Sequence, residues 1–248
     1  MTNSFDDIVE GAQAYLIIGS NTTENHPVLG MRLRQAIKTR NVPLIVCDPR
    51  RIPIAEFATL HIRHRPGTDI ALLNGIMHVL IAEELYDREF VAERTEEFEA
   101  LREVVASYTP ERVAEICDIS GGQVREAAHI LAAHHPAAMM YAMGITQHSS
   151  GHENVMSCAN LQMLLGNMGV AGGGVNPLRG QANVQGACDM GGLPNFYPGY
   201  QRVDVEANRQ KFCAAWGVEL SPDVGLTIVE MMNGACSGRV RSLYIIGE

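Results

Sequence analysis

Short apolar runs alternate with longer helical patterns along most of this 248-residue chain. The apolar runs lie at Ala14–Ile18, Val42–Cys47, Thr59–Ile62 and Ala137–Ala142. The helical patterns span residues 27–39, 69–84, 87–107, 110–116, 120–133 and 151–165. Strands joined by crossover helices predict an α/β fold with a doubly wound, mostly parallel sheet of the dinucleotide-binding kind.

Each of these predicted strands ends at glycines or polar residues. The ends are residues 19–21, 47–48, 65–69 and 143–147. Because ligands of such sheets bind beyond the carboxyl ends of the strands, the sequence predicts that these segments converge on one polar crevice.

Residues 176–192 form the most informative stretch of the chain, with two asparagines, two glutamines, four glycines and a single arginine, Arg179. The run has neither helical nor strand periodicity, which predicts a long ordered loop. A guanidinium in such a loop suits a small anion or a phosphate. An ordinary surface loop is the competing interpretation.

The last part of the chain has a different pattern. Residues 193–200 are irregular, residues 205–216 and 226–233 are helical in pattern, and Ser242–Ile246 is expected to be a strand. A chain that stops directly after a core strand is expected to be a fragment of a longer polypeptide.

The composition excludes several classes of protein. A formal net charge of −9 argues against general binding to nucleic acid or to a membrane surface. No apolar run is long enough to cross a bilayer, the one at residues 15–19 included, and the first residues lack the basic start of a signal peptide. The six cysteines contain no Cys-x-x-Cys pair, which favours reduced thiols in the cytoplasm over a metal or iron–sulfur site.

The strand ends contain several candidate binding residues, each with a simpler alternative. The turn at Gly19, Ser20 and Asn21 can cradle a phosphate with its backbone N–H groups or can be purely structural. Asp48 lies where mononucleotide-binding folds place an acid on a ribose or a base, although a turn aspartate is equally frequent there. Asp69 can accept two N–H bonds from a guanine edge, or can simply stabilise the first turn of a helix.

No arrangement of side chains in the sequence supplies chemistry by itself. Histidine spacing typical of metal sites is missing, and no serine or cysteine has the context of an activated nucleophile. The reaction therefore belongs to a cofactor, or to residues outside this chain.

Two segments resemble a known family specifically. Residues 143–148, Met-Gly-Ile-Thr-Gln-His, and residues 178–190, Leu-Arg-Gly-Gln-Ala-Asn-Val-Gln-Gly-Ala-Cys-Asp-Met, are similar to the catalytic (alpha) subunit of formate dehydrogenases. These enzymes belong to the bis-molybdopterin guanine dinucleotide oxidoreductases, which use molybdenum or tungsten. Residues 1–4, 19–21, 26–27, 46–50 and 195–200 extend the similarity over essentially the whole chain.

The resemblance implies roles for particular residues. Arg179 corresponds to the arginine that orients formate. Gln181, Met143, Gly144 and Gln147 would lie along the pterin, and the guanine nucleotide end would be held by Ser20, Asn21, Cys47, Asp48, Arg50, Gly67 and Asp69. Residues 1–181 would form the α/β domain that binds one molybdopterin guanine dinucleotide, and residues 182–248 part of a neighbouring α/β domain.

The resemblance also implies parts that this chain does not contain. The metal ligand of the family, a cysteine or selenocysteine, and a 4Fe–4S cluster lie before the segment that matches Met1, so no residue here is assigned to the metal. Formate and carbon dioxide, the remaining parts of the subunit and electron-transfer subunits are the expected partners, and this chain alone is expected to be inactive. The alternatives are another bis-molybdopterin oxidoreductase, such as a nitrate-reductase-like enzyme, and a non-catalytic nucleotide-binding module.

Overall fold

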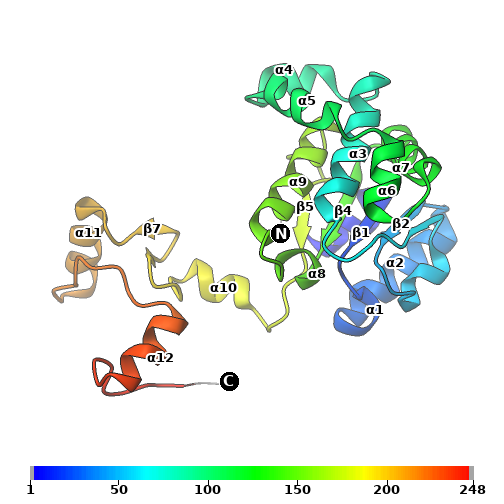
Figure 1. Ribbon diagram of the computed structural model, residues 1–248. Helices are drawn as coiled ribbons and strands as arrows, with labels where there is room; N and C mark the ends of the chain where they lie inside the picture. The colour runs from blue at the N-terminus through cyan, green and yellow to red at the C-terminus, as the bar shows by residue number, and fades with distance from the viewer. Residues whose placement is uncertain (1–2, 246–248) are drawn as a thin grey trace. The chain divides into compact units, whose positions relative to one another are not determined.

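The computed structural model of the chain describes residues 3–245 (Figure 1). The chain divides into two compact units, Met1–Leu178 and Arg179–Glu248, and each unit is described by itself. None of the helices within the described residues is both long and apolar enough to cross a membrane.

The first unit is built on a five-stranded parallel sheet, which confirms the predicted fold class. The strands lie in the order β3-β2-β1-β4-β5. Their bounds are β1 Ala14–Ile18, β2 Leu44–Cys47, β3 Leu60–Ile62, β4 Ala137–Tyr141 and β5 Val175–Pro177. The central strands β1, β2 and β4 are completely buried, because helices cover both faces of the sheet.

Two hydrophobic cores lie on opposite faces of this sheet. Along β1, Leu16 and Ile18 belong to one core, and Tyr15 and Ile17 belong to the other, as the alternation of a strand requires. The first core packs against α3 (Asp69–Ala82), α6 (Pro110–Cys117), α7 (Gly121–Ala133) and α9 (Gly151–Leu164). The second packs against η1 (Asp7–Gly11), α2 (Pro27–Arg40) and η2 (Pro53–Phe57). Two short helices, α1 (Thr22–Asn25) and α8 (Met143–Thr146), follow β1 and β4.

The prediction of one continuous helix over residues 87–107 is wrong. It forms two helices, α4 (Arg88–Arg94) and α5 (Phe98–Ala106). Thr95 has an extended backbone and its hydroxyl donates to the Val91 carbonyl, while Glu97 has a left-handed φ of 57°. The break brings Phe98 against Tyr86, with ring centroids 5.2 Å apart, so packing overrides the local helical pattern.

The sequence predicted one long loop over residues 176–192, and this prediction is wrong. Asn176 and Pro177 belong to β5, and Val184–Asp189 form the short helix α10. Asn176 is completely buried, and its side-chain amide donates to the carbonyls of Met139, Gly173 and Gly174. A polar residue satisfied in this way occupies a core strand without apolar periodicity.

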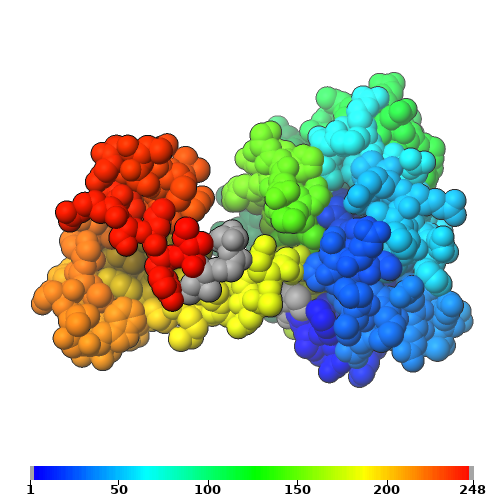
Figure 2. Space-filling model, turned by 90° about the horizontal axis from the view of Figure 1, so that it is seen from below, coloured from blue at the N-terminus to red at the C-terminus, as the bar shows by residue number. Residues whose placement is uncertain are grey.

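The second unit contains the hairpin of β6 (Phe196–Tyr197) and β7 (Gln201–Arg202) and the helices α11 (Glu206–Trp216) and α12 (Ile228–Cys236). Tyr197, Phe212 and Trp216 form its aromatic cluster, with Tyr197 and Phe212 rings 4.6 Å apart. Helix α12 lies in the orange-to-red part of the chain in Figure 2, and its Ile228 and Val229 are both 64% exposed.

The strand predicted at Ser242–Ile246 does not form in the described residues. Residues 242–245 have no regular structure, Tyr244 is 91% exposed, and Ile246 lies outside the described residues. A strand is stable only when it pairs with a neighbour, and no strand of this unit pairs with residues 242–245.

A buried polar network joins α9 to the start of β4. The side-chain amide of Gln162 donates to the carbonyls of Ala137 (2.9 Å) and Gly174 (2.8 Å), and Gln162 in turn accepts a 2.7 Å bond from Asn167. The Asn167 side chain accepts from the Ala137 N–H. Because Gln162 and Asn167 are at most 1% exposed, each bond replaces water that the fold has excluded.

We therefore expect Gln162→Leu to lower the free energy of unfolding by roughly 3 kcal/mol, because it removes the donor to the Ala137 and Gly174 carbonyls and leaves the Asn167 amide without its acceptor in the core. Urea denaturation followed by circular dichroism measures the change. The exposed Gln35 has no side-chain hydrogen bond, so Gln35→Leu is the control and should change stability by less than about 0.5 kcal/mol. Equal effects of the two substitutions would contradict a stabilising role for the network.

Candidate functional site

The crevice of the first unit lies where the strand order reverses. β1 has β2 on one side and β4 on the other, and the connections after β1 and β4 leave towards opposite edges of the sheet. Such a switch point is the usual ligand site of an open parallel sheet.

Two glycines meet at this point, one after each strand. The Gly144 N–H donates a 3.0 Å bond to the Gly19 carbonyl. A Cβ on Gly144 would lie 2.6 Å from the Gly19 Cα, and a Cβ on Gly19 would lie 2.7 Å from the Gly144 carbonyl carbon. Only glycine at both positions lets the two turns come this close.

A cavity of about 200 Å³ opens beside this glycine pair. Six residues predicted to bind the cofactor line it: Cys47, Asp48, Arg50, Gly67, Asp69 and Gly144. Gly19, from the turn that the sequence offers as a phosphate cradle, also lines the cavity, together with Pro49, His64, Pro66 and His148. Segments that follow β1, β2, β3 and β4 therefore converge on one cavity.

Asp48 follows β2 directly and is 4% exposed. Its Oδ1 accepts the backbone N–H of Arg50 at 2.8 Å and lies 3.6 Å from the Arg50 Nε. This is the turn-aspartate geometry that the sequence left open as an alternative. The bond uses Oδ1, so Oδ2 keeps its capacity to accept a further hydrogen bond.

Asp69 begins α3 and forms a buried pair with His64. The His64 Nε2 lies 2.9 Å from the Asp69 Oδ1, with the two side chains 3% and 5% exposed. The His64 Nδ1 is buried and has no hydrogen-bond partner among the described residues. The imidazole therefore donates from Nε2 and fixes the carboxylate, which leaves Oδ2 for another partner.

The sequence analysis missed His64. Its only signal is local, since it stands five residues before Asp69 in the turn His64-Arg-Pro-Gly-Thr-Asp69. A histidine placed beside a candidate ligand-binding acid by a proline–glycine turn is a candidate for orienting that acid.

The cysteines of this region are packing residues. Burial raises the pKa of the Cys47 thiol far above its ordinary value and that of Cys158 to about 12, and the negative charge of Asp69 adds to both shifts. A thiol in such surroundings stays protonated and unreactive, so Cys47 contributes an apolar wall to the cavity.

The other predicted residues do not line the cavity. Ser20 and Asn21 directly follow the lining residue Gly19 and are buried, and the Asn21 Oδ1 has no hydrogen-bond partner among the described residues. Met143, at the start of α8, and Gln147, directly after it, are exposed. Arg179 and Gln181 are exposed residues of the second unit. The roles of these six residues stay predictions.

The chemistry of the cavity is that of hydrogen-bond acceptance. Two buried carboxylates face it, and Arg50, whose side chain is 71% exposed, is the only lysine or arginine that lines it. Such a site suits a ligand edge rich in N–H donors. Within residues 3–245, no three histidine, cysteine, aspartate or glutamate side chains are grouped so that they can hold a metal ion.

Comparisons with known proteins agree on one family. The model of the family described as molybdopterin oxidoreductase matches residues 1–248. The chain is 47% identical over 248 residues to F420-dependent formate dehydrogenase 1 subunit alpha of Methanococcus maripaludis, covering 100% of this chain and 36% of that protein. It is also 47% identical over 249 residues to formate dehydrogenase H of Escherichia coli, covering 100% of this chain and 34% of that protein. The chain thus spans about a third of the length of these curated relatives.

A solved structure shares the fold. Acetylene hydratase from Pelobacter acetylenicus matches with a TM-score of 0.59 and 37% identity, over 66% of this chain and 22% of that chain.

We expect Gly144→Ala to lower the free energy of unfolding by about 1–3 kcal/mol, because its Cβ would collide with the Gly19 backbone. Thermal or urea denaturation measures the loss. In the control, Gly122→Ala at the start of α7, the new Cβ meets only the Ser120 Oγ, at 3.7 Å, so stability should stay the same or rise. A neutral Gly144→Ala would show that the glycine contact does not constrain the crevice.

Proposed function

Because the chain belongs to the molybdopterin oxidoreductase family, we propose that its first unit holds the guanine nucleotide end of molybdopterin guanine dinucleotide in a formate dehydrogenase catalytic subunit. The cavity at the switch point, with the buried carboxylates of Asp48 and Asp69, carries the proposal.

The acceptor chemistry of the cavity fits guanine. The Watson–Crick edge of guanine offers the N1–H and the N2 amino group side by side, and one carboxylate can accept both. Asp69 is fixed by His64 through Oδ1 and is therefore oriented before a ligand arrives. Gly67 adds room, because a Cβ built there meets nothing within 4 Å.

We assign the ribose to Asp48. Its position directly after β2 is where dinucleotide-binding sheets place the acid that accepts ribose hydroxyl groups. Arg50 extends from the same turn into solvent, where its guanidinium can approach a phosphate. We assign contacts with the pterin to Met143, Gly144, Gln147 and Gln181. Ser20 and Asn21 are assigned to the guanine nucleotide end.

The reaction that we propose is oxidation of formate to carbon dioxide, which releases one proton and two electrons. When bound, the cofactor supplies a molybdenum or tungsten centre that takes up those electrons. Arg179 holds the formate carboxylate by paired N–H···O bonds, which fixes the direction of the C–H bond. The metal ligand, the 4Fe–4S cluster and the electron-transfer subunits are proposed to be supplied outside this chain. The six free cysteines favour a reducing, cytoplasmic setting.

A second candidate is a different reaction on the same cofactor cradle. The likeness to acetylene hydratase favours it, since that protein's name describes hydration. The whole-chain identity of 46–47% to relatives named as formate dehydrogenases outweighs an identity of 37% over 66% of the chain.

The nucleotide site is tested by exchanging the acceptor at Asp69. We expect Asp69→Asn to weaken binding of guanosine diphosphate to this chain by about 10- to 100-fold, because the amide NH₂ replaces one acceptor oxygen. Xanthosine diphosphate carries a C2 carbonyl in place of the amino group, so the variant should bind it better than the native chain does. Isothermal titration calorimetry measures both affinities, and Asp118→Asn, at an exposed position that does not line the cavity, is the control. Unchanged guanosine binding would refute the assignment of Asp69.

Arg179 is tested in a catalytic subunit that carries this sequence. Arg179→Ala is expected to lower kcat/KM for formate by at least 100-fold while the cofactor content stays normal, because the arginine holds the substrate only. Formate-dependent dye reduction and metal analysis give the two readouts, with the exposed Arg239→Ala as the control. Loss of the cofactor from the Arg179 variant would instead make Arg179 a cofactor-binding residue.

A further inference from the structure

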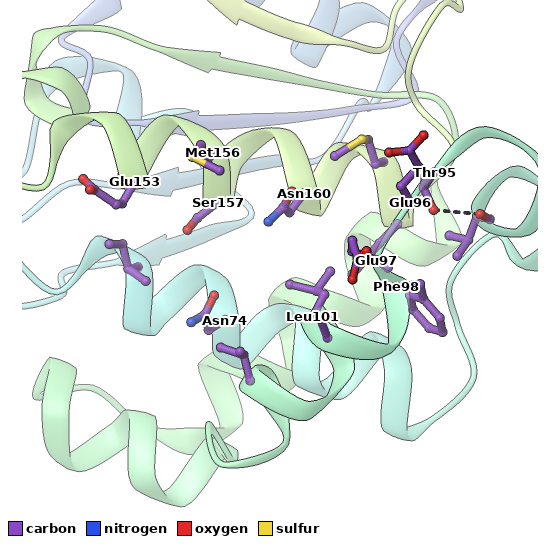
Figure 3. Close-up of a pocket in the computed structure, with 16 residues that line it drawn as sticks. Asn74, Thr95, Glu96, Glu97, Phe98, Leu101, Glu153, Met156, Ser157 and Asn160 are labelled. Carbon is purple, nitrogen blue, oxygen red and sulfur yellow. Dashed lines mark hydrogen bonds between the residues drawn. The ribbon is translucent and has the colours of Figure 1, made fainter.

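A second cavity of the first unit lies away from the strand ends. It has a volume of about 440 Å³ and is bordered by α3, α4, α5, α9 and the turn at residues 95–97 (Figure 3). This volume falls within the range of small-molecule sites. It shares no lining residue with the cavity at the switch point.

The walls of the cavity are mainly apolar. Val91, Leu101 and Leu164 line it, and Val104 and Met156 continue it to the surface with exposed fractions of 57% and 50%. Burying these side chains under an aliphatic ligand would remove apolar area from water, which favours binding.

Polar side chains interrupt the apolar wall at its centre. Asn74 is 6% exposed and Ser157 is 8% exposed, so both are more than nine-tenths buried. Figure 3 shows Asn74 rising from α3 towards α9, and Ser157 and Asn160 extending from α9 towards α3. None of the three side chains forms a hydrogen bond to another residue of the described part of the chain, so their polar groups can bond a ligand that enters the cavity.

The two ends of the cavity are acidic. Glu153 lies at one end, and Glu96 and Glu97 lie at the other (Figure 3). These three carboxylates are exposed and form no salt bridge with any described residue. The nearest arginines in sequence have other partners, since Arg102 pairs with Glu99 and Arg94 lies over the Phe90 ring. No lysine, arginine or histidine lines the cavity.

The spacing of the acidic ends follows from the helix that forms one wall. Glu153 and Met163 both line the cavity from α9 and are ten residues apart, which is about 15 Å along a helix. The other end of α9 is joined to α4, because the Asp87 N–H donates to the Leu164 carbonyl at 2.8 Å. The Thr95–Glu97 turn that follows α4 brings its two carboxylates to that end.

We propose that this cavity binds a linear aliphatic cation with an ammonium group at each end, the chemistry of a diamine or polyamine. The alkyl chain lies along the apolar walls, the ammonium groups pair with Glu153 and with Glu96 or Glu97, and N–H groups along the chain reach Asn74 and Ser157. The proposal does not depend on the nucleotide site.

The test measures binding of matched ligands to the 248-residue chain in about 0.15 M salt. At this ionic strength, the attraction between a ligand charge and carboxylates farther away than roughly 8 Å is largely screened. The ligands are 1,8-diaminooctane, octylamine and 1,8-octanediol, which share one chain and carry two, one and no charges. We expect the diamine to bind about tenfold more tightly than the monoamine by calorimetry, and the diol not to bind measurably. Equal affinities of the two amines would overturn the two-ended site.

Variants then distinguish the cavity from general attraction to an acidic protein. Glu153→Gln should weaken diamine binding about threefold or more, the increment of an exposed ion pair, and Glu115→Gln on α6 should not. Asn74→Leu should abolish binding by filling the centre, and Ser157→Ala gives a milder second variant if the leucine variant does not fold. If Glu115→Gln lowers affinity as much as Glu153→Gln, or if the native chain does not bind the diamine at millimolar concentration, the proposal is wrong.

Discussion

The contact between Gly19 and Gly144 determines the shape of the first unit at its functional edge. Two strands that are neighbours in the sheet send their chains in opposite directions, and the backbones touch where they part. Since neither position has a side chain, the crevice floor is made of backbone, and a ligand can approach the strand ends closely. The aspartates that follow β2 and β3 then flank this floor, and their carboxylates determine what the cavity can recognise.

The buried polar groups of this unit are of two kinds. Gln162, Asn167 and Asn176 form hydrogen bonds with backbone groups or with each other, so they stabilise the fold. Asp48 and Asp69 use one oxygen each inside the protein and keep the other. The number of side-chain polar atoms that are hydrogen-bonded within the protein therefore separates structural from binding residues more clearly than burial does, because all five residues are less than 5% exposed.

The sequence was sufficient for the features that depend on local pattern and insufficient for those that depend on distant partners. Ala14–Ile18 coincides with β1, and the convergence of the strand ends follows from the parallel topology alone. The break at Thr95–Glu97 depends on packing of Phe98 against Tyr86, and the pairing of His64 with Asp69 depends on a three-dimensional turn. Residues 242–246 have the pattern of a strand, but a pattern cannot supply the neighbouring strand that pairing requires.

The cavity at the switch point and the cavity between the helices both present carboxylates, yet they discriminate between ligands by different physical means. At the switch point the acids are buried and oriented by fixed hydrogen bonds, so the direction of a donor decides affinity, and a charge without matching geometry gains little. In the helical cavity the acids are exposed at the ends of an apolar groove, so charge and chain length decide. A neutral base edge therefore belongs at the first site and an aliphatic ammonium at the second, although both cavities are acidic and lie on one compact unit.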